Sequence, residues 1–227
     1  MRQPLSAVFT LAFVAMAFAG DGPGAKQIAE AYGIQGFHQI DSLSFTFNVE
    51  KDGKQMVSRA WTWEPKTGKV GYSGPDKAGK PIQATYNRNT EAKANEELEQ
   101  GFINDSYWFL FPMHLVWDTN VEITQDGMKP MPMPPGEGHC VTVHYTGGGF
   151  TPGDVYKLYV TPDNHVSQWT FQGGGKGDER PFTWEDHRKL GPIVVALEHK
   201  GPGGKFRLWF SDVSATVGGK TVTPQAM

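Results

Sequence analysis

Glu185 and His187 are the pair of residues whose types and spacing come nearest to a catalytic arrangement. They are two positions apart in a segment that alternates like a strand, so both side chains lie on one face. A carboxylate that orients an imidazole is half of a general-base arrangement. The sequence has no Gly-x-Ser-x-Gly motif to supply a nucleophile, and a structural pair explains the same spacing. We expect no catalytic residues, and a secreted hydrolase that uses His187 with Glu185 is the alternative.

Histidine and cysteine are the other residues that could carry chemistry. The seven histidines include no His-Glu-x-x-His motif, and His139 and His144 are an odd number of positions apart, so they would point to opposite faces of a regular strand. Cys140 is the single cysteine, which excludes an internal disulfide, and nothing beside it would activate the thiol. We therefore predict no metal site and no cofactor.

Large aromatic side chains form the stronger candidate site. In a strand over residues 57–63 the odd positions share one face, and a second aromatic group follows in residues 104–118. We predict that the two groups line an apolar cavity in which one charged side chain orients the ligand. The predicted ligand-binding residues are Arg59, Trp61, Trp63, Trp108, Phe109 and Phe111. The alternative is an ordinary aromatic core, with Arg59 extending to its rim.

The second aromatic group follows a polar stretch, residues 90–102, that has the pattern of a solvated helix. Pro112 divides this aromatic segment. We expect a helical turn before Pro112 that acts as a lid carrying Trp108 and Phe111, and a strand-like part after it that places Trp117 in the core.

Most of the remaining chain alternates as short strands between turns rich in Gly, Pro and Asn. Residues 193–200 are apolar at both odd and even positions, so both faces of the sheet should be covered. Residues 25–32 predict a helix. Residues 126–138, with four Pro and three Met, predict an irregular surface loop.

The N-terminus is typical of a secretory signal peptide. Arg2 precedes an apolar run that ends in Ala17-Phe18-Ala19. We expect a signal peptide of residues 1–19, one β-rich domain over residues 20–227, and a periplasmic protein without a lipid anchor, since no cysteine directly follows the run. The formal net charge of −3 argues against a nucleic-acid partner.

The order of these elements resembles the outer-membrane lipoprotein-sorting (LolA-like) superfamily, of which the chain would be a divergent member. The resemblance rests on residues 25–33 (AKQIAEAYG), residues 40–49 (IDSLSFTFNV), a Trp-bearing return strand, a helical insertion and the hairpin of residues 154–169. It implies a mainly β (α+β) fold: a strongly curved antiparallel sheet, or incomplete barrel, with helices covering the concave face and room for acyl chains.

Together these observations predict a carrier that binds a hydrophobic or lipidic ligand without covalent chemistry. The expected partners are a hydrophobic small molecule, a lipid or an acylated protein, with transient contact to a membrane or to a periplasmic protein. We expect a monomer. A domain that binds only other proteins, through residues 126–138, is a further alternative.

Overall fold

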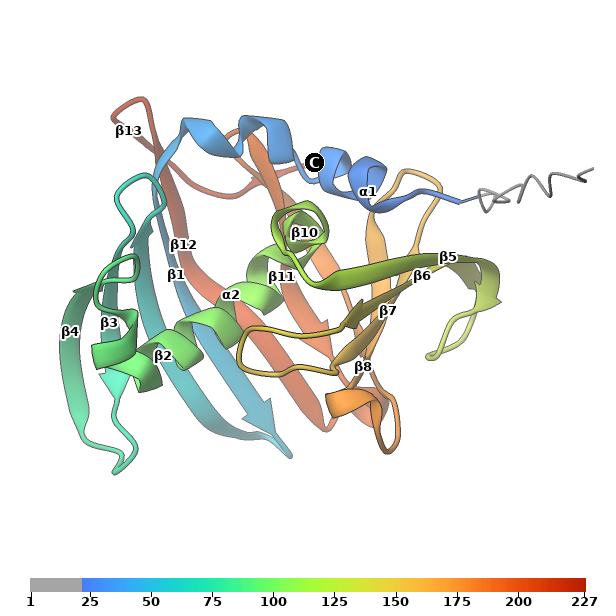
Figure 1. The fold of residues 1–227 in the computed structure, drawn as a ribbon, viewed down its shortest axis with the longest axis horizontal. Helices are drawn as coiled ribbons and strands as arrows, with labels where there is room; N and C mark the ends of the chain where they lie inside the picture. The colour runs from blue at the N-terminus through green and yellow to red at the C-terminus, as the bar shows by residue number, and fades with distance from the viewer. Residues whose placement is uncertain (1–21) are drawn as a thin grey trace, which may run out of the picture.

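A computed structural model describes residues 22–227, so the expected signal peptide lies outside the described residues. Within this region the strands form two antiparallel sheets that do not close on one another, and a long helix crosses between them (Figure 1). The predicted fold class, a mainly β protein with a curved antiparallel sheet and helical cover, is confirmed.

The larger sheet has the order β14-β10-β11-β12-β1-β2-β3-β4, with β13 paired to β12. Its strands are β1 (Ile40–Lys51), β2 (Lys54–Glu64), β3 (Lys69–Pro75), β4 (Pro81–Asn87), β10 (Glu185–Leu190), β11 (Ile193–Lys200), β12 (Phe206–Val217), β13 (Lys220–Val222) and β14 (Gln225–Ala226). On β1 the alternating residues Leu43, Phe45 and Phe47 are buried, which explains the period-two pattern of the sequence. The strands predicted over residues 57–63 and 193–200 are present, whereas the strand-like part expected after Pro112 is helical.

The smaller sheet contains the strands between α2 and β10 in the order β5-β6-β7-β8-β9. They are β5 (Val121–Pro130), β6 (Glu137–Tyr145), β7 (Val155–Val160), β8 (Val166–Gln172) and β9 (Arg180–Thr183). The chain returns to the larger sheet at Trp184, whose backbone N–H donates to the carbonyl of Ser167 (2.7 Å). Trp184 packs between Trp169 and His199, so one buried side chain joins the two sheets.

The prediction of an irregular loop over residues 126–138 is wrong. β5 and β6 pair as far as Pro130 and Glu137, which leaves only residues 131–136 outside the ladder. A register shift between Gln125 and Gly127 accommodates the unusual sequence, and Gly127 takes the positive φ of 72° that this bulge requires. The prolines are confined to the end of β5 and to the turn, where no ladder hydrogen bond is lost.

The helical segments are α1 (Ala25–Ala31) and α2 (Glu96–Trp117), with the short 3-10 turns η1 (Ile34–Gln39), η2 (Ala92–Asn95), η3 (Gly173–Gly175) and η4 (Pro202–Gly204). The predicted helix over residues 25–32 is confirmed. The predicted division at Pro112 is wrong, because α2 continues through it to Trp117. Its neighbours Phe111 and Met113 are buried, and this burial outweighs the roughly 3 kcal/mol that an interior proline costs.

The core lies where α2 passes between the sheets. Phe109 stacks on Phe45 of β1 with ring centroids 4.7 Å apart, and Phe111 contacts Trp169 of β8 at 5.0 Å. α2 is therefore a shared core element of both sheets, and residues 107–111 are not a separate lid.

Candidate functional site

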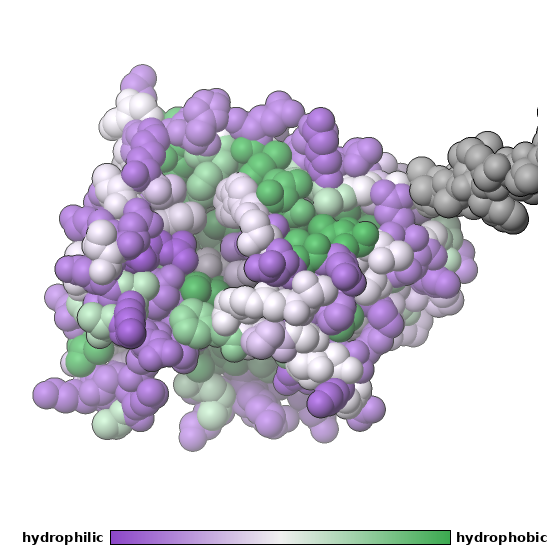
Figure 2. Space-filling model, in the orientation of Figure 1, coloured by the Kyte–Doolittle hydropathy of each residue, from purple (hydrophilic) through white to green (hydrophobic). Residues whose placement is uncertain are grey.

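A cavity of about 780 Å³ lies along α2, on the side that faces the smaller sheet. Aromatic rings make up much of its wall: Trp63, Tyr107, Trp108, Phe150, Tyr156 and Phe182. Figure 2 shows hydrophobic residues gathered in the middle of this face, with hydrophilic residues around them. The connection between β6 and β7 extends toward α2 (Figure 1), and Phe150 of this loop lines the cavity while it is 44% exposed.

Trp63 and Trp108 are the two predicted site residues that line this cavity. Trp108 projects from α2 between Trp169 and Phe182, with ring centroids 4.7 and 5.0 Å away. Trp63 packs beside Phe37. Both side chains are half-buried, so they can gain contact with a ligand.

The other four predicted site residues have protein partners and do not line the cavity. Arg59 and Trp61 of β2 both donate to the buried carboxylate of Asp105, from Arg59 Nε (2.8 Å) and Trp61 Nε1 (2.7 Å). Phe109 and Phe111 are almost fully buried in the core. A role for these four residues in ligand binding stays a prediction, and their surroundings are those of the core.

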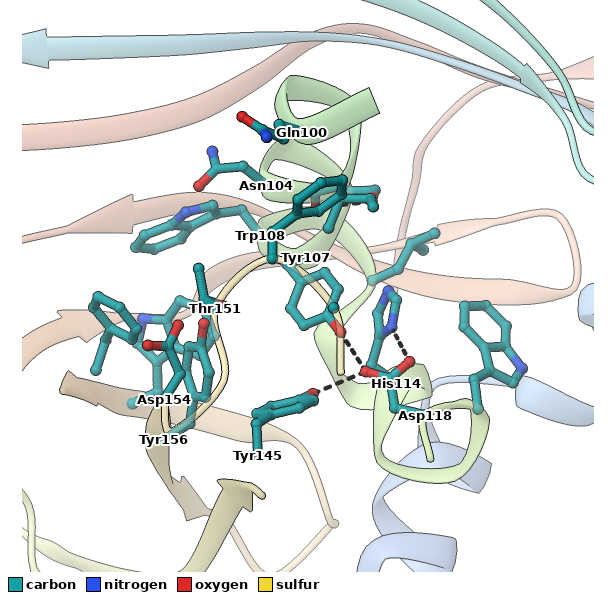
Figure 3. Close-up of a pocket in the computed structure, with 18 of the residues that line it drawn as sticks. Gln100, Asn104, Tyr107, Trp108, His114, Asp118, Tyr145, Thr151, Asp154 and Tyr156 are labelled. Atoms are coloured by element: carbon teal, nitrogen blue, oxygen red, sulfur yellow. Dashed lines mark hydrogen bonds and ion pairs between the residues drawn. The ribbon is translucent and has the colours of Figure 1, made fainter. Parts of the chain in front are cut away.

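The polar part of the cavity is built around Asp118, the residue that ends α2. Its Oδ1 accepts a hydrogen bond from His114 Nδ1 (2.9 Å), and its Oδ2 accepts hydrogen bonds from the hydroxyls of Tyr107 and Tyr145 (2.9 Å for Tyr145). Figure 3 shows the three side chains converging on this carboxylate. Burial opposes ionisation of Asp118, but these hydrogen bonds outweigh burial and hold its pKa below the usual value.

Both tyrosines respond to the same environment. Burial, and then the neighbouring Asp118 carboxylate, raise the pKa of Tyr107. Burial raises the pKa of Tyr145 as well, and its neighbours Tyr107 and Asp118 add to the rise. Both hydroxyls therefore stay protonated and act as donors to Asp118.

Sequence patterns alone did not predict this cluster, although the spacing of three of its residues in the sequence pointed to it. Tyr107, His114 and Asp118 are separated by seven and four positions, which puts them on one face of a continuous helix. Treating Pro112 as a break concealed that spacing. Tyr145 reaches the cluster from β6, and no local pattern links it to α2.

Two arginines line the same cavity. Arg88 forms an ion pair with Glu99 (2.8 Å) and lies over the ring of Phe102. Arg180 lies over the ring of Phe171, 4.8 Å from its centroid, and forms no ion pair with any side chain in residues 22–227. The cavity therefore combines aromatic walls, the hydrogen-bonded carboxylate of Asp118 and the guanidinium of Arg180, which has no ion-pair partner in residues 22–227.

The Glu185 and His187 pair that the sequence offered for catalysis does not form. The Glu185 carboxylate binds Lys200 (2.8 Å). The hydroxyl of Tyr32 accepts a hydrogen bond from the backbone N–H of Val166, so its proton is directed to His187 Nε2 (2.8 Å). Burial lowers the pKa of His187 to about 4.

His114 and Asp118 do form a histidine–carboxylate pair. Within the described part of the chain no serine, threonine or cysteine side chain hydrogen-bonds to His114. Across residues 22–227 no three His, Cys, Asp or Glu side chains gather as a metal site would require. No helix in the same residues is long and apolar enough to cross a membrane.

No family model matches the chain, and no curated protein matches it in sequence. Solved structures do match. The chain is similar in structure to LolA-like proteins. A putative outer membrane lipoprotein-sorting protein domain from Vibrio parahaemolyticus matches with a TM-score of 0.48 and 8% identity over 86% of this chain and 93% of that chain. A LolA superfamily protein from Nitrosomonas europaea matches with a TM-score of 0.47 and 8% identity over 85% of this chain and 93% of that chain. A DUF1329 family protein from Desulfovibrio piger matches with a TM-score of 0.45 and 9% identity over 87% of this chain and 95% of that chain.

Proposed function

We propose that this protein is an exported carrier that binds a hydrophobic or lipidic ligand in the cavity along α2, without covalent chemistry. The observation that supports this most is the aromatic cavity itself. Its volume of about 780 Å³ falls in the range of small-molecule sites, which are usually lined by apolar and aromatic side chains with a few placed polar groups.

The walls suit an elongated apolar molecule. Trp63 and Trp108 would provide flat apolar surfaces, and Tyr156 and Phe182 extend the aromatic wall on the side of the smaller sheet. Removing apolar surface from water contributes about 25 cal/mol per Å², so such contacts would drive binding without a specific polar match. Phe150, on the loop between β6 and β7, lines the cavity and would cover the bound molecule.

The test is a titration of the purified protein, stripped of bound lipid, with the neutral dye Nile red and with a fluorescent fatty acid. We expect micromolar or tighter binding, and native mass spectrometry of protein isolated from a bacterial periplasm should show a co-purifying lipid. Trp108→Ala should weaken dye binding about ten- to hundredfold, since it removes a ring that covers the ligand.

Trp209→Ala is the matched control, because Trp209 is a half-buried tryptophan of β12 that packs against Arg207 and does not line the cavity. It should leave the dye affinity within about twofold. A wild-type protein that binds neither probe and carries no lipid would contradict the proposal.

Export is part of the same proposal. If residues 1–19 are removed as a signal peptide, then the mature protein begins at Gly20. N-terminal sequencing of the protein recovered from the periplasm tests this, and an intact Met1 in that fraction would contradict it.

A further inference from the structure

The carboxylate of Asp118 uses every hydrogen-bond donor in the polar cluster around it. Tyr107 and Tyr145 each have one hydroxyl proton, and both protons are directed to Asp118 Oδ2. His114 Nδ1 must carry the proton that it shares with Oδ1, because a carboxylate is only an acceptor. While the imidazole of His114 is neutral, the side chains of Tyr107, His114 and Tyr145 therefore have no hydrogen-bond donor left for a ligand.

The same side chains still have lone pairs. Each tyrosine hydroxyl can accept another hydrogen bond, and in a neutral imidazole Nε2 is an acceptor. His114 Nε2 points away from Asp118 in Figure 3, and it makes no hydrogen bond with any residue that the structure describes. Since Tyr107, His114 and Tyr145 all line the cavity, this end of it offers acceptors to a ligand.

The charge around the cluster also favours a ligand that donates hydrogen bonds over an anionic ligand. Asp118 is an anion, and the cavity residue Arg88 is already neutralised by Glu99. A second carboxylate, Asp154, also lines the cavity. Aromatic rings such as Trp117 and Tyr107 lie beside His114, and their faces attract cations. Beside a neutral His114 imidazole, a ligand carboxylate or phosphate would find neither a donor nor a positive charge at this position.

We propose that Tyr107, His114 and Tyr145, fixed by Asp118, form a subsite for a hydrogen-bond-donating head group, an ammonium or a hydroxyl, of an amphiphilic ligand. This inference rests on the proposed function, since the apolar part of the ligand would occupy the aromatic cavity. Arg180 lines the same cavity and is the competing position, because an unpaired guanidinium would select an anionic head group instead.

The experiment measures displacement of Nile red by three dodecyl amphiphiles that differ only in the head group. Dodecylammonium and dodecanol are donors, and dodecanoate is an acceptor at about pH 8. We expect both donors to bind about tenfold more tightly than dodecanoate, as one to two well-placed hydrogen bonds would give. Dodecyltrimethylammonium, a cation without a donor, separates charge from hydrogen bonding and should bind more weakly than dodecylammonium.

Asp118→Asn is the decisive variant. It removes the anion and frees the tyrosine protons, so the preference for the donors, measured as a ratio of affinities within the variant, should fall to less than about threefold. Asp163→Asn is the matched control: Asp163 also accepts a hydrogen bond from a histidine, His165 Nδ1 (2.9 Å), but it does not line the cavity. It should keep the full preference. Should Asp118→Asn fail to fold, Tyr145→Phe removes one acceptor and should reduce the preference.

The outcomes separate the two proposals. If Nile red does not bind the wild-type protein, both the proposed function and the subsite are overturned. If Nile red binds but dodecanoate displaces it as well as dodecylammonium does, only the subsite is overturned. A preference for dodecanoate that Arg180→Gln abolishes would assign the head group to Arg180 and would likewise overturn the subsite. An unchanged preference in Asp118→Asn and Tyr145→Phe would do the same.

Discussion

Asp105 of α2 is fully buried, and its carboxylate accepts hydrogen bonds from Arg59, Trp61 and Asn104. Burial raises the pKa of this carboxyl, and the guanidinium of Arg59 works against that rise by favouring the charged form. The group ties α2 to β2, so the single arginine that the sequence offered to a ligand is held by the protein's own carboxylate.

Asp105→Ala should therefore destabilise the protein by about 3–5 kcal/mol, because it leaves the guanidinium of Arg59 and the indole N–H of Trp61 without their acceptor. The measurement is the free energy of unfolding in urea. Glu97→Ala is the control, since the ion pair of Glu97 with Lys77 is exposed and should contribute less than about 1 kcal/mol. Equal effects of the two substitutions would contradict this account of the buried network.

Two buried histidines predict how stability depends on pH. Burial lowers the pKa of His199 to about 3 and that of His187 to about 4. In the unfolded chain both titrate near the ordinary value of about 6.5. Between these values the unfolded state binds protons that the folded state does not, so stability is lost as the pH falls below about 6.5.

We expect each such histidine to lower the free energy of unfolding by about 2 kcal/mol between about pH 7 and pH 5. Urea midpoints across this range give the slope, and the carboxylates with lowered pKa contribute mainly below it. His199→Gln should flatten the dependence, whereas His38→Gln, at an exposed position, should not. A slope that His199→Gln leaves unchanged would show that His199 is not the source.

At the scale of elements, α2 combines a core face and a cavity face on one continuous helix. Phe111 points into the core and is fully buried, whereas Trp108 lines the cavity. Phe111→Ala should cost about 3–5 kcal/mol of stability, as truncation of a buried aromatic does, and should leave the dye affinity of the folded fraction nearly unchanged.

In contrast to Phe111→Ala, Trp108→Ala should reduce the dye affinity more than it reduces the free energy of unfolding. A paired measurement of urea midpoint and Nile red affinity in both variants checks this. If Trp108→Ala unfolds the protein without a separable binding defect, then Trp108 belongs to the core and the cavity loses its central wall.

The elements also show where sequence information ends. Period-two alternation predicted the strands because burial on one face is a local property, as at Phe45 and Phe47. Pro112 and the Pro-rich end of β5 misled the prediction, since tertiary burial and the pairing of β5 with β6 override local preference. No role was predicted for Asp105 and Asp118 from the sequence, because only the arrival of Arg59 and Tyr145 from distant strands makes them centres of polar networks.

At the scale of the whole molecule, the cavity lies between α2 and a smaller sheet that the chain inserts between β4 and β10. The β6–β7 loop extends toward α2 (Figure 1), and it carries Phe150 at a position that is both exposed and part of the cavity wall. We therefore expect a ligand to enter and leave the cavity past this loop.

Phe150→Ser should speed the release of Nile red about two- to tenfold, because it removes an apolar cover, and should leave the urea midpoint unchanged. Stopped-flow displacement measures the release rate. Met56→Ser is a control at another exposed apolar position, away from the cavity, and it should leave release unaffected. If Phe150→Ser and Met56→Ser release Nile red at the same rate, then the loop does not control ligand release.

The strand pairing of β1 affects how the newly synthesised chain folds. β1 pairs on one side with β2, its neighbour in sequence, and on the other side with β12, where Phe47 lies opposite Phe210. A chain emerging N-terminus first holds β1 with an open edge until β12 arrives, and open edges join other chains. Pairing over such a sequence separation is also slow. Newly made protein should therefore depend on dilution or on a chaperone that shields this edge.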